Sequence, residues 1–195
     1  MQRFLRAYWR RIAREEPSAY LEANVVAGRR RVLALVARWM SPLDGLRVAD
    51  LGCESGLATR YLDARGAKVV GVDLRMRGSW IGEPGSRYVV ADLLLPVVQG
   101  ECFDVVLVQE VVEGGSDSER RELLAALAGW GAKRLVLVAR CPTGWSRFRS
   151  HTAVVDPVEL LRMVHLQTPY RLVRQEEVRQ RNYRGLVAEF HHGPR

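Results

Sequence analysis

A chain of 195 residues with 48% hydrophobic and 27% charged residues can bury the core of one domain and is too apolar to be disordered. We expect neither a membrane span nor a secretory signal peptide, because no apolar run approaches the roughly 20 residues that a bilayer requires. The three cysteines Cys53, Cys102 and Cys141 lie far apart and fit no zinc spacing. They predict free thiols in a reducing, cytoplasmic compartment and no metal site.

The net charge of +8 is unevenly distributed. Arginines are concentrated in residues 1–48 and 140–195, whereas acidic residues outnumber basic ones between these segments. Basic flanks favour anionic partners such as carboxylates, phosphates or nucleic acid. The same excess is also expected of a sequence that uses arginine in place of lysine, since only Lys68 and Lys133 are lysines. Charge alone therefore does not choose the partner.

The first 41 residues predict two helices. Apolar residues recur at helical spacing from Phe4 to Ile12, and Pro17 ends that run. Ser18 can cap a second helix that extends to Met40, before Ser41-Pro42. We expect residues 1–41 to form a helical lid or extension of a domain that spans residues 42–195.

After residue 42, short apolar runs alternate with amphipathic ones. Nearly uniform apolar strands are typical of a sheet covered on both faces, and their alternation with helices predicts a doubly wound parallel α/β sheet. A helix beginning at Asp156-Pro157 and a hairpin of two β-rich segments then close the domain. The expected strands are 46–51, 68–73, 88–91, 103–109, 133–139, 170–178 and 183–190, and the expected helices between them are 57–65 and 117–130.

The segment from Asp50 to Gly56 joins a strand to a helix through two glycines. Such a turn lets a ligand approach the backbone, and Asp73 at the end of the next strand can accept the hydroxyls of a ribose. A dinucleotide fingerprint would place its first two glycines one residue apart, whereas Gly52 and Gly56 are separated by three residues, including Glu54. A carboxylate in this loop disfavours a pyrophosphate and suits the positively charged S-adenosylmethionine.

These residues resemble the motifs of class I S-adenosylmethionine-dependent methyltransferases. The first motif is Asp50-Leu-Gly-Cys-Glu-Ser-Gly56, the second ends in Asp73, the third in Asp92, and the fourth is the strand ending in Gln109-Glu110. The resemblance implies a Rossmann-like sheet of seven strands in the order 3-2-1-4-5-7-6. The cofactor-binding residues that it implies are Asp50, Gly52, Cys53, Gly56, Asp73, Leu74, Asp92, Leu93 and Gln109.

The resemblance further implies transfer of a methyl group to a small, anionic or aromatic acceptor, by O- or N-methylation. Glu110 and His151 are the candidate catalytic residues, and Glu113 could serve as the base in place of Glu110. A looser resemblance, carried by the helix before the first motif and by the C-terminal tail, is to the magnesium-protoporphyrin O-methyltransferases. Those enzymes share a histidine at the end of strand four, where this chain has Gln109.

Two departures leave other functions open. Glu54 replaces the middle glycine of the first motif, and the link 74–87 is too rich in glycine and proline for the usual helix. The exposed sheet face could be covered by the N-terminal helices or by a second subunit in a homodimer. One alternative is therefore a non-catalytic binding protein with this fold. Another is an RNA methyltransferase, although no Asn-Pro-Pro-Tyr-like motif follows strand four.

Overall fold

The computed structural model describes residues 19–76, 80, 87–95, 102–113, 116–141, 155–180 and 183–193, with side chains in the first helix described from Arg30 onward. Seven strands form one sheet in the order β3-β2-β1-β4-β5-β7-β6, which confirms the predicted topology. The strands are β1 (Arg47–Leu51), β2 (Lys68–Asp73), β3 (Arg87–Val90), β4 (Val105–Gln109), β5 (Arg134–Arg140), β6 (Tyr170–Gln180) and β7 (Tyr183–His192).

The first five strands are parallel to one another, and the C-terminal hairpin is antiparallel. β1 pairs with β2 and β4, and β5 pairs with β7 in the opposite direction. Consequently the carboxyl ends of β1 to β5 meet at one edge of the sheet, and the start of β7 meets them there: Arg140 is paired with Gly185. Functional side chains of doubly wound folds collect at this edge.

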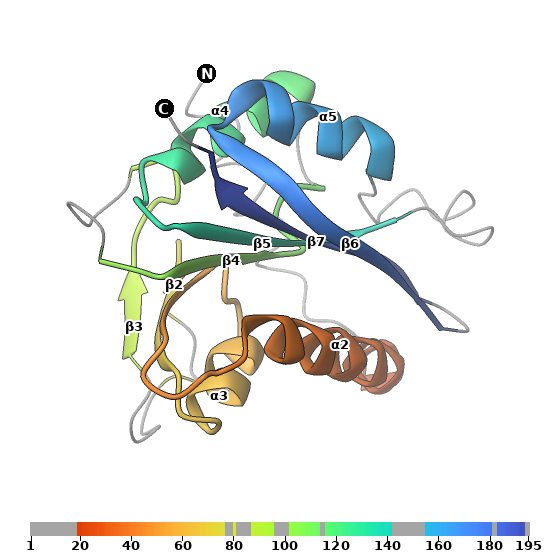
Figure 1. Cartoon of the computed structure of the whole chain (residues 1–195). Helices are drawn as coiled ribbons and strands as arrows, with labels where there is room; N and C mark the ends of the chain where they lie inside the picture. The colour runs from red at the N-terminus through yellow and green to blue at the C-terminus, as the bar shows by residue number, and fades with distance from the viewer. Residues whose placement is uncertain are drawn as a thin grey trace.

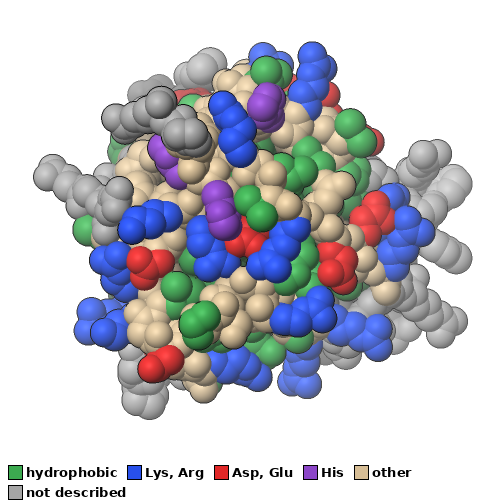
Figure 2. Space-filling model, in the orientation of Figure 1, with side chains coloured by type: hydrophobic (Ala, Val, Ile, Leu, Met, Phe, Trp, Pro, Cys, Tyr) green, Lys and Arg blue, Asp and Glu red, His purple; other side chains and the backbone are tan. Residues whose placement is uncertain are grey.

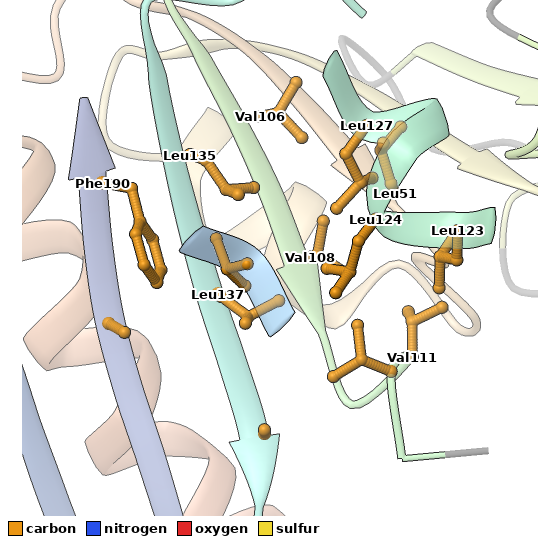
Figure 3. Packing of buried hydrophobic residues seen from close by; sticks show 14 of the residues in the cluster. Leu51, Val106, Val108, Val111, Leu123, Leu124, Leu127, Leu135, Leu137 and Phe190 are labelled. Carbon is orange, nitrogen blue, oxygen red and sulfur yellow. The ribbon is translucent and has the colours of Figure 1, made fainter. Parts of the chain in front are cut away.

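Helices cover both faces of the sheet, as Figure 1 shows. On one face α2 (Ala19–Met40) and α3 (Leu57–Asp63) pack on a cluster that includes Val48, Val105 and Val136. On the other face α4 (Asp117–Ala128) and α5 (Pro157–Gln167) pack on a second cluster. Figure 3 shows part of it, with Leu124 and Leu127 of α4 beside Val106 and Val108 of β4. This burial on both faces explains the uniformly apolar central strands.

Local sequence signals set the helix ends. Ser116 and Glu119 form a reciprocal capping box at the start of α4, and the Asp156 carboxylate accepts backbone N–H groups at the start of α5, with Pro157 in its first turn. α2 matches the predicted second helix, while the predicted helix at 4–12 lies outside the described residues. α3 is two residues shorter than expected, and both hairpin strands are two residues longer. No described helix is long and apolar enough to cross a membrane.

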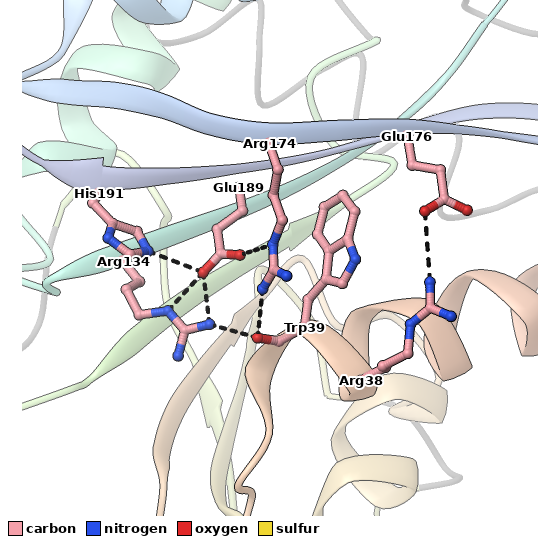
Figure 4. A network of polar contacts seen from close by, with 7 residues as sticks. All are labelled: Arg38, Trp39, Arg134, Arg174, Glu176, Glu189 and His191. Carbon is pink, nitrogen blue, oxygen red and sulfur yellow. Dashed lines mark hydrogen bonds and ion pairs between the residues drawn. The ribbon is translucent and has the colours of Figure 1, made fainter.

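Polar contacts attach the end of α2 to the sheet. The Trp39 carbonyl accepts hydrogen bonds from Arg134 of β5 at 2.9 Å and Arg174 of β6 at 2.8 Å. Both arginines also pair with the buried carboxylate of Glu189, which contacts His191 as well, as Figure 4 shows. Cations at the carbonyl end of a helix satisfy its last acceptors and complement its dipole. This network lies at the amino end of β5, away from the edge where the predicted site residues collect.

Candidate active site at the carboxyl edge of the sheet

The turn between β1 and α3 is a tight loop whose backbone requires glycine at two positions. Gly52 and Gly56 have φ values of 74° and 79°, in the left-handed region. A Cβ at Gly52 would overlap a methyl of Val111, and one at Gly56 would overlap the Tyr88 hydroxyl. The loop is therefore pressed against the segments that follow β4 and begin β3, and a side chain at either glycine would displace it.

Two backbone hydrogen bonds attach the start of the loop to β2. The N–H groups of Gly52 and Cys53 both donate to the Val72 carbonyl, at 2.8 and 3.1 Å. Asp73, the next residue of β2, accepts the Glu54 N–H at 3.0 Å on one carboxylate oxygen and the Arg75 N–H at 3.3 Å on the other. The structure thus brings together the loop and Asp73, as their sequence spacing predicts.

Asp50 lies beneath the loop and is almost completely buried. Its carboxylate accepts the Thr59 hydroxyl of α3 at 2.6 Å. Burial raises the pKa of Asp50 to about 6, and the Thr59 hydrogen bond opposes that increase. Cys53 is also buried, and burial raises the pKa of its thiol, with the Asp50 charge acting in the same direction. This thiol is therefore protonated at neutral pH and serves as a small packing group.

Asp92 and Leu93 follow β3 at the same edge. The Asp92 carboxylate accepts the Leu94 N–H at 3.1 Å, which forms a turn after the strand. The Leu93 carbonyl accepts the indole N–H of Trp130 at 3.2 Å, so the turn is attached to the segment after α4. Leu74, directly after Asp73, is partly buried. These residues form the side of the edge next to β2 and β3.

On the other side of the loop, the end of β4 carries a cluster of ionisable groups. Glu110 has a left-handed φ of 54°. Its carboxylate pairs with Arg140 of β5 at 2.6 Å and accepts the Tyr183 hydroxyl of β7 at 3.2 Å. Burial raises the pKa of Tyr183, and the Glu110 charge raises it further, so the tyrosine stays a donor. Gln109, the last residue of β4, is half-buried beside this cluster.

Glu113 completes the cluster from the segment after β4. Its carboxylate accepts the backbone N–H of Arg140, and its other oxygen has no partner among the described residues. The amide oxygen of Gln109 likewise has none among the residues placed by the structure. Burial raises the pKa of Glu113 to about 7, against the opposing Arg140 N–H and with the help of the Glu110 charge. Glu113 therefore exchanges its proton near neutral pH.

Sequence reasoning identified Glu110 but missed its partners Arg140 and Tyr183. It also missed Thr59, the partner of Asp50, and Trp80, the partner of Glu54 in the loop. Arg140 comes directly after an expected strand, which is a signal that a careful count of strand ends could have used. Tyr183 reaches the edge only through the antiparallel register of the hairpin. His151 lies outside the described residues. His165 is exposed on α5, and the part of the chain that the structure describes contains no cluster of three metal-binding side chains.

Residues 49–130 match the family model described as a methyltransferase domain. The ubiquinone biosynthesis O-methyltransferase of Rhizobium rhizogenes is 41% identical over 87 residues, which are 40% of this chain and 34% of that protein. The chain thus matches about a third of the length of this relative. The family model begins at Ala49 and therefore includes the glycine loop, Asp73, Asp92 and Glu110.

The solved structures that share the fold include two methyltransferases. The magnesium protoporphyrin IX methyltransferase of Synechocystis PCC 6803, with bound SAH, has a TM-score of 0.74 at 20% identity, over 96% of this chain and 94% of that one. The N-methyltransferase NodS of Bradyrhizobium japonicum has a TM-score of 0.67 at 16% identity, over 86% and 88% of the two chains. At these identities the likeness establishes the fold.

Proposed function

We propose that this chain, which has the fold of the class I methyltransferases, transfers a methyl group from S-adenosylmethionine to a small-molecule acceptor. The observation that carries the proposal is the position of the Asp73 carboxylate, fixed against the glycine loop by the Glu54 N–H at 3.0 Å. A carboxylate at the end of the second strand, beside such a loop, accepts ribose hydroxyls. Each carboxylate oxygen accepts more than one hydrogen bond, so the loop contacts leave Asp73 this capacity.

The charge of the edge fits this cofactor. Asp50, Asp73 and Glu110 are acidic, and they lie at the ends of neighbouring strands or directly after them. S-adenosylmethionine carries a sulfonium and an ammonium group and no phosphate, so acidic surroundings attract it. The same surroundings repel a pyrophosphate. The donor and acceptor chemistry therefore supports S-adenosylmethionine over a dinucleotide.

The residues divide by the part of the cofactor that each would bind. We assign the ribose to Asp73 and the adenine amino group to Asp92, with Leu74 and Leu93 in apolar contact beside them. The remaining residues, which we assign to the methionine end of the cofactor, are Asp50, Gly52, Cys53, Gly56 and Gln109. When bound, S-adenosylmethionine supplies a methyl group on a positively charged sulfur for in-line displacement. The task of the chain is alignment and the exclusion of water.

The cluster after β4 supports an acceptor with a hydroxyl or amine. The Arg140 guanidinium already pairs with Glu110, so it is poorly placed to bind a substrate carboxylate. Glu110 and Glu113 can receive the proton that a hydroxyl or amine releases on methylation. We therefore place Glu110 in contact with the acceptor and favour a small aromatic alcohol or amine. A role for His151 in catalysis stays a prediction.

Methyl transfer from labelled S-adenosylmethionine tests this function. We expect label to enter catechol or aniline in preference to benzoate, because only the first two give up a proton to the cluster. The Asp73→Asn variant should raise KM for S-adenosylmethionine by about tenfold to a hundredfold, since an amide at this position loses charge-assisted hydrogen bonds to the ribose. Asp104→Asn, which removes an acid that pairs with Arg47 at the opposite edge, is the matched control.

An Asp73→Asn variant with unchanged KM would contradict the ribose assignment. Transfer to benzoate alone would contradict the proton-accepting role of the cluster. A protein that binds S-adenosylmethionine but methylates none of the three probes would support only the cofactor part of the proposal. In that case the acceptor class would be wrong and the cofactor assignment would stand.

The charged surface favours a small acceptor over RNA. Figure 2 shows Lys and Arg side chains spread over one face, with acidic side chains between them. Several arginines of β5 to β7 are already in ion pairs with Glu177 or Glu189. Such arginines are less available to phosphates than an unpaired basic patch would be. Binding of a short RNA that weakens steeply with salt would instead favour the RNA methyltransferase alternative.

A further inference from the structure

Glu54 occupies a backbone conformation that ordinarily favours glycine. Its φ of 48° lies in the left-handed region, and it stands where the resembled motif has its middle glycine. A residue with a Cβ reaches this region only against a steric penalty, so something else must hold it there. The Glu54 side chain is exposed, and contacts of its backbone hold this residue in place.

Two hydrogen bonds fix the Glu54 backbone from opposite sides. Its N–H donates to the Asp73 carboxylate at 3.0 Å, and its carbonyl accepts the indole N–H of Trp80 at 2.9 Å. The first bond connects the loop to the proposed ribose acceptor. The second connects it to Trp80, in the link between β2 and β3. Trp80 thus provides a contact across the loop from a segment that is otherwise short and rich in glycine.

Trp80 is itself well placed to act as a fixed donor. Its side chain is 8% exposed and stacks on Tyr88 of β3, with ring centroids 4.6 Å apart and an angle of 6° between the planes. Tyr88 in turn lies over Gly71, where a Cβ would stand 2.7 Å from the Tyr88 ring. The tyrosine hydroxyl reaches Gly56 at the far end of the loop. The two stacked rings therefore contact both the middle and the end of the glycine loop.

We propose that Trp80 is a positioning residue of the cofactor site, which stabilises the left-handed conformation of Glu54 and thereby orients the Asp73 carboxylate toward the ribose. The inference rests on the proposed function, since it assigns Trp80 to the same site. It also explains how the chain accommodates a glutamate at a glycine position. Trp80 acts through Glu54 and Asp73, and the proposal assigns it no contact with the reacting atoms.

The test compares Trp80→Phe with a rescuing substitution. Phenylalanine keeps an aromatic ring on Tyr88 but removes the N–H donor, so we expect binding of S-adenosylhomocysteine to weaken by about fivefold to tenfold, as for one lost hydrogen bond. Adding Glu54→Gly should restore the affinity to within about twofold of the parent, because glycine adopts this φ without help. Calorimetry measures the affinity. Hydrogen exchange of residues 52–56 in the ligand-free protein measures the loop directly and should be faster in Trp80→Phe.

The control is Trp39→Phe, a substitution of another buried tryptophan at the far end of the sheet, which should lower Tm and leave the affinity unchanged. Unchanged affinity and unchanged exchange in Trp80→Phe would overturn the inference, as would a Glu54→Gly substitution that fails to rescue. A parent protein that binds neither S-adenosylmethionine nor S-adenosylhomocysteine would overturn the proposed function instead. The exchange measurement would then decide alone whether Trp80 fixes the loop.

Discussion

At the scale of single residues, the edge of the sheet contains several carboxyl groups in different environments. Asp50 and Glu113 are buried and have raised pKa values, of about 6 and about 7, chiefly because burial disfavours their charged forms. Glu177, on the hairpin, is paired with Arg184 and Arg179, and their hydrogen bonds lower its pKa to about 2. Groups with raised and lowered pKa values affect the stability of the protein in opposite directions as the pH changes.

Glu113 predicts a measurable pH dependence of stability. Because the folded state raises its pKa from 4.5 to about 7, the folded protein binds the proton more tightly than the unfolded chain does. Its contribution is fully favourable below about pH 4.5 and is lost as the pH rises to about 7. Glu113→Gln keeps an acceptor for the Arg140 N–H and removes the titration. We expect this variant to gain about 1 to 3 kcal/mol relative to the parent between pH 5 and pH 8.

Urea unfolding of both proteins at pH 5 and pH 8 measures that difference. The ionisable groups near Glu113 include Glu110, Arg140, Arg120, Tyr183 and Cys141, and they are unchanged in the variant. A stability difference between parent and variant that does not depend on pH would show that Glu113 titrates as it does in the unfolded chain. Glu177 contributes to the pH dependence of stability with the opposite sign. Its contribution is the same in both proteins, so it cancels when the stability of the variant is subtracted from that of the parent.

At the scale of elements, the attachment of α2 depends on one buried carboxylate. Glu189 is 1% exposed, and although burial raises its pKa, hydrogen bonds from His191, Arg134 and Arg174 together lower it. Removing its charge in Glu189→Gln should destabilise the protein by about 1 to 2 kcal/mol, less than for a fully buried pair because the arginines remain partly solvated. Hydrogen exchange at the end of α2 should also become faster.

The matched control is Glu176→Gln, which removes the exposed ion pair with Arg38 of the same helix, drawn at the right of Figure 4. An exposed pair contributes little, so the change should be below about 0.5 kcal/mol. Equal effects of the two substitutions would mean that Glu189 stabilises the attachment of α2 no more than the exposed ion pair does. Thermal or urea unfolding distinguishes the two outcomes.

The elements were largely predictable from the sequence, and several of their contacts were not. Apolar runs located each strand to within about two residues, and they are clearest in β1, β4 and β5, where both faces of the sheet are buried. Arg140 meets Glu110 through the parallel pairing of β4 and β5. Tyr183 meets Glu110 only through the antiparallel register of β5 and β7, which no local pattern encodes. Trp80 lies in a link without periodicity, so its contact with Glu54 could not be anticipated.

At the scale of the whole molecule, one edge of the sheet combines a glycine loop, the carboxylate that we propose as the ribose acceptor, and a polar cluster. The loop and Asp73 adjoin β1 and β2, while Glu110, Arg140 and Tyr183 adjoin β4, β5 and β7. The proposal assigns the cofactor to the first group and the acceptor to the second. This order along the edge is why the proposed cofactor and acceptor sites are neighbours, and why one fold can serve acceptors of different chemistry.

The central claim is that this edge binds S-adenosylmethionine. Titration calorimetry of the full chain with S-adenosylhomocysteine tests it most directly, because this demethylated product needs no acceptor and does not react. We predict one binding site per chain, with affinity reduced by about tenfold or more in Asp73→Asn and unchanged in Asp104→Asn. No detectable heat at millimolar ligand, or equal binding by the parent and Asp73→Asn, would contradict it.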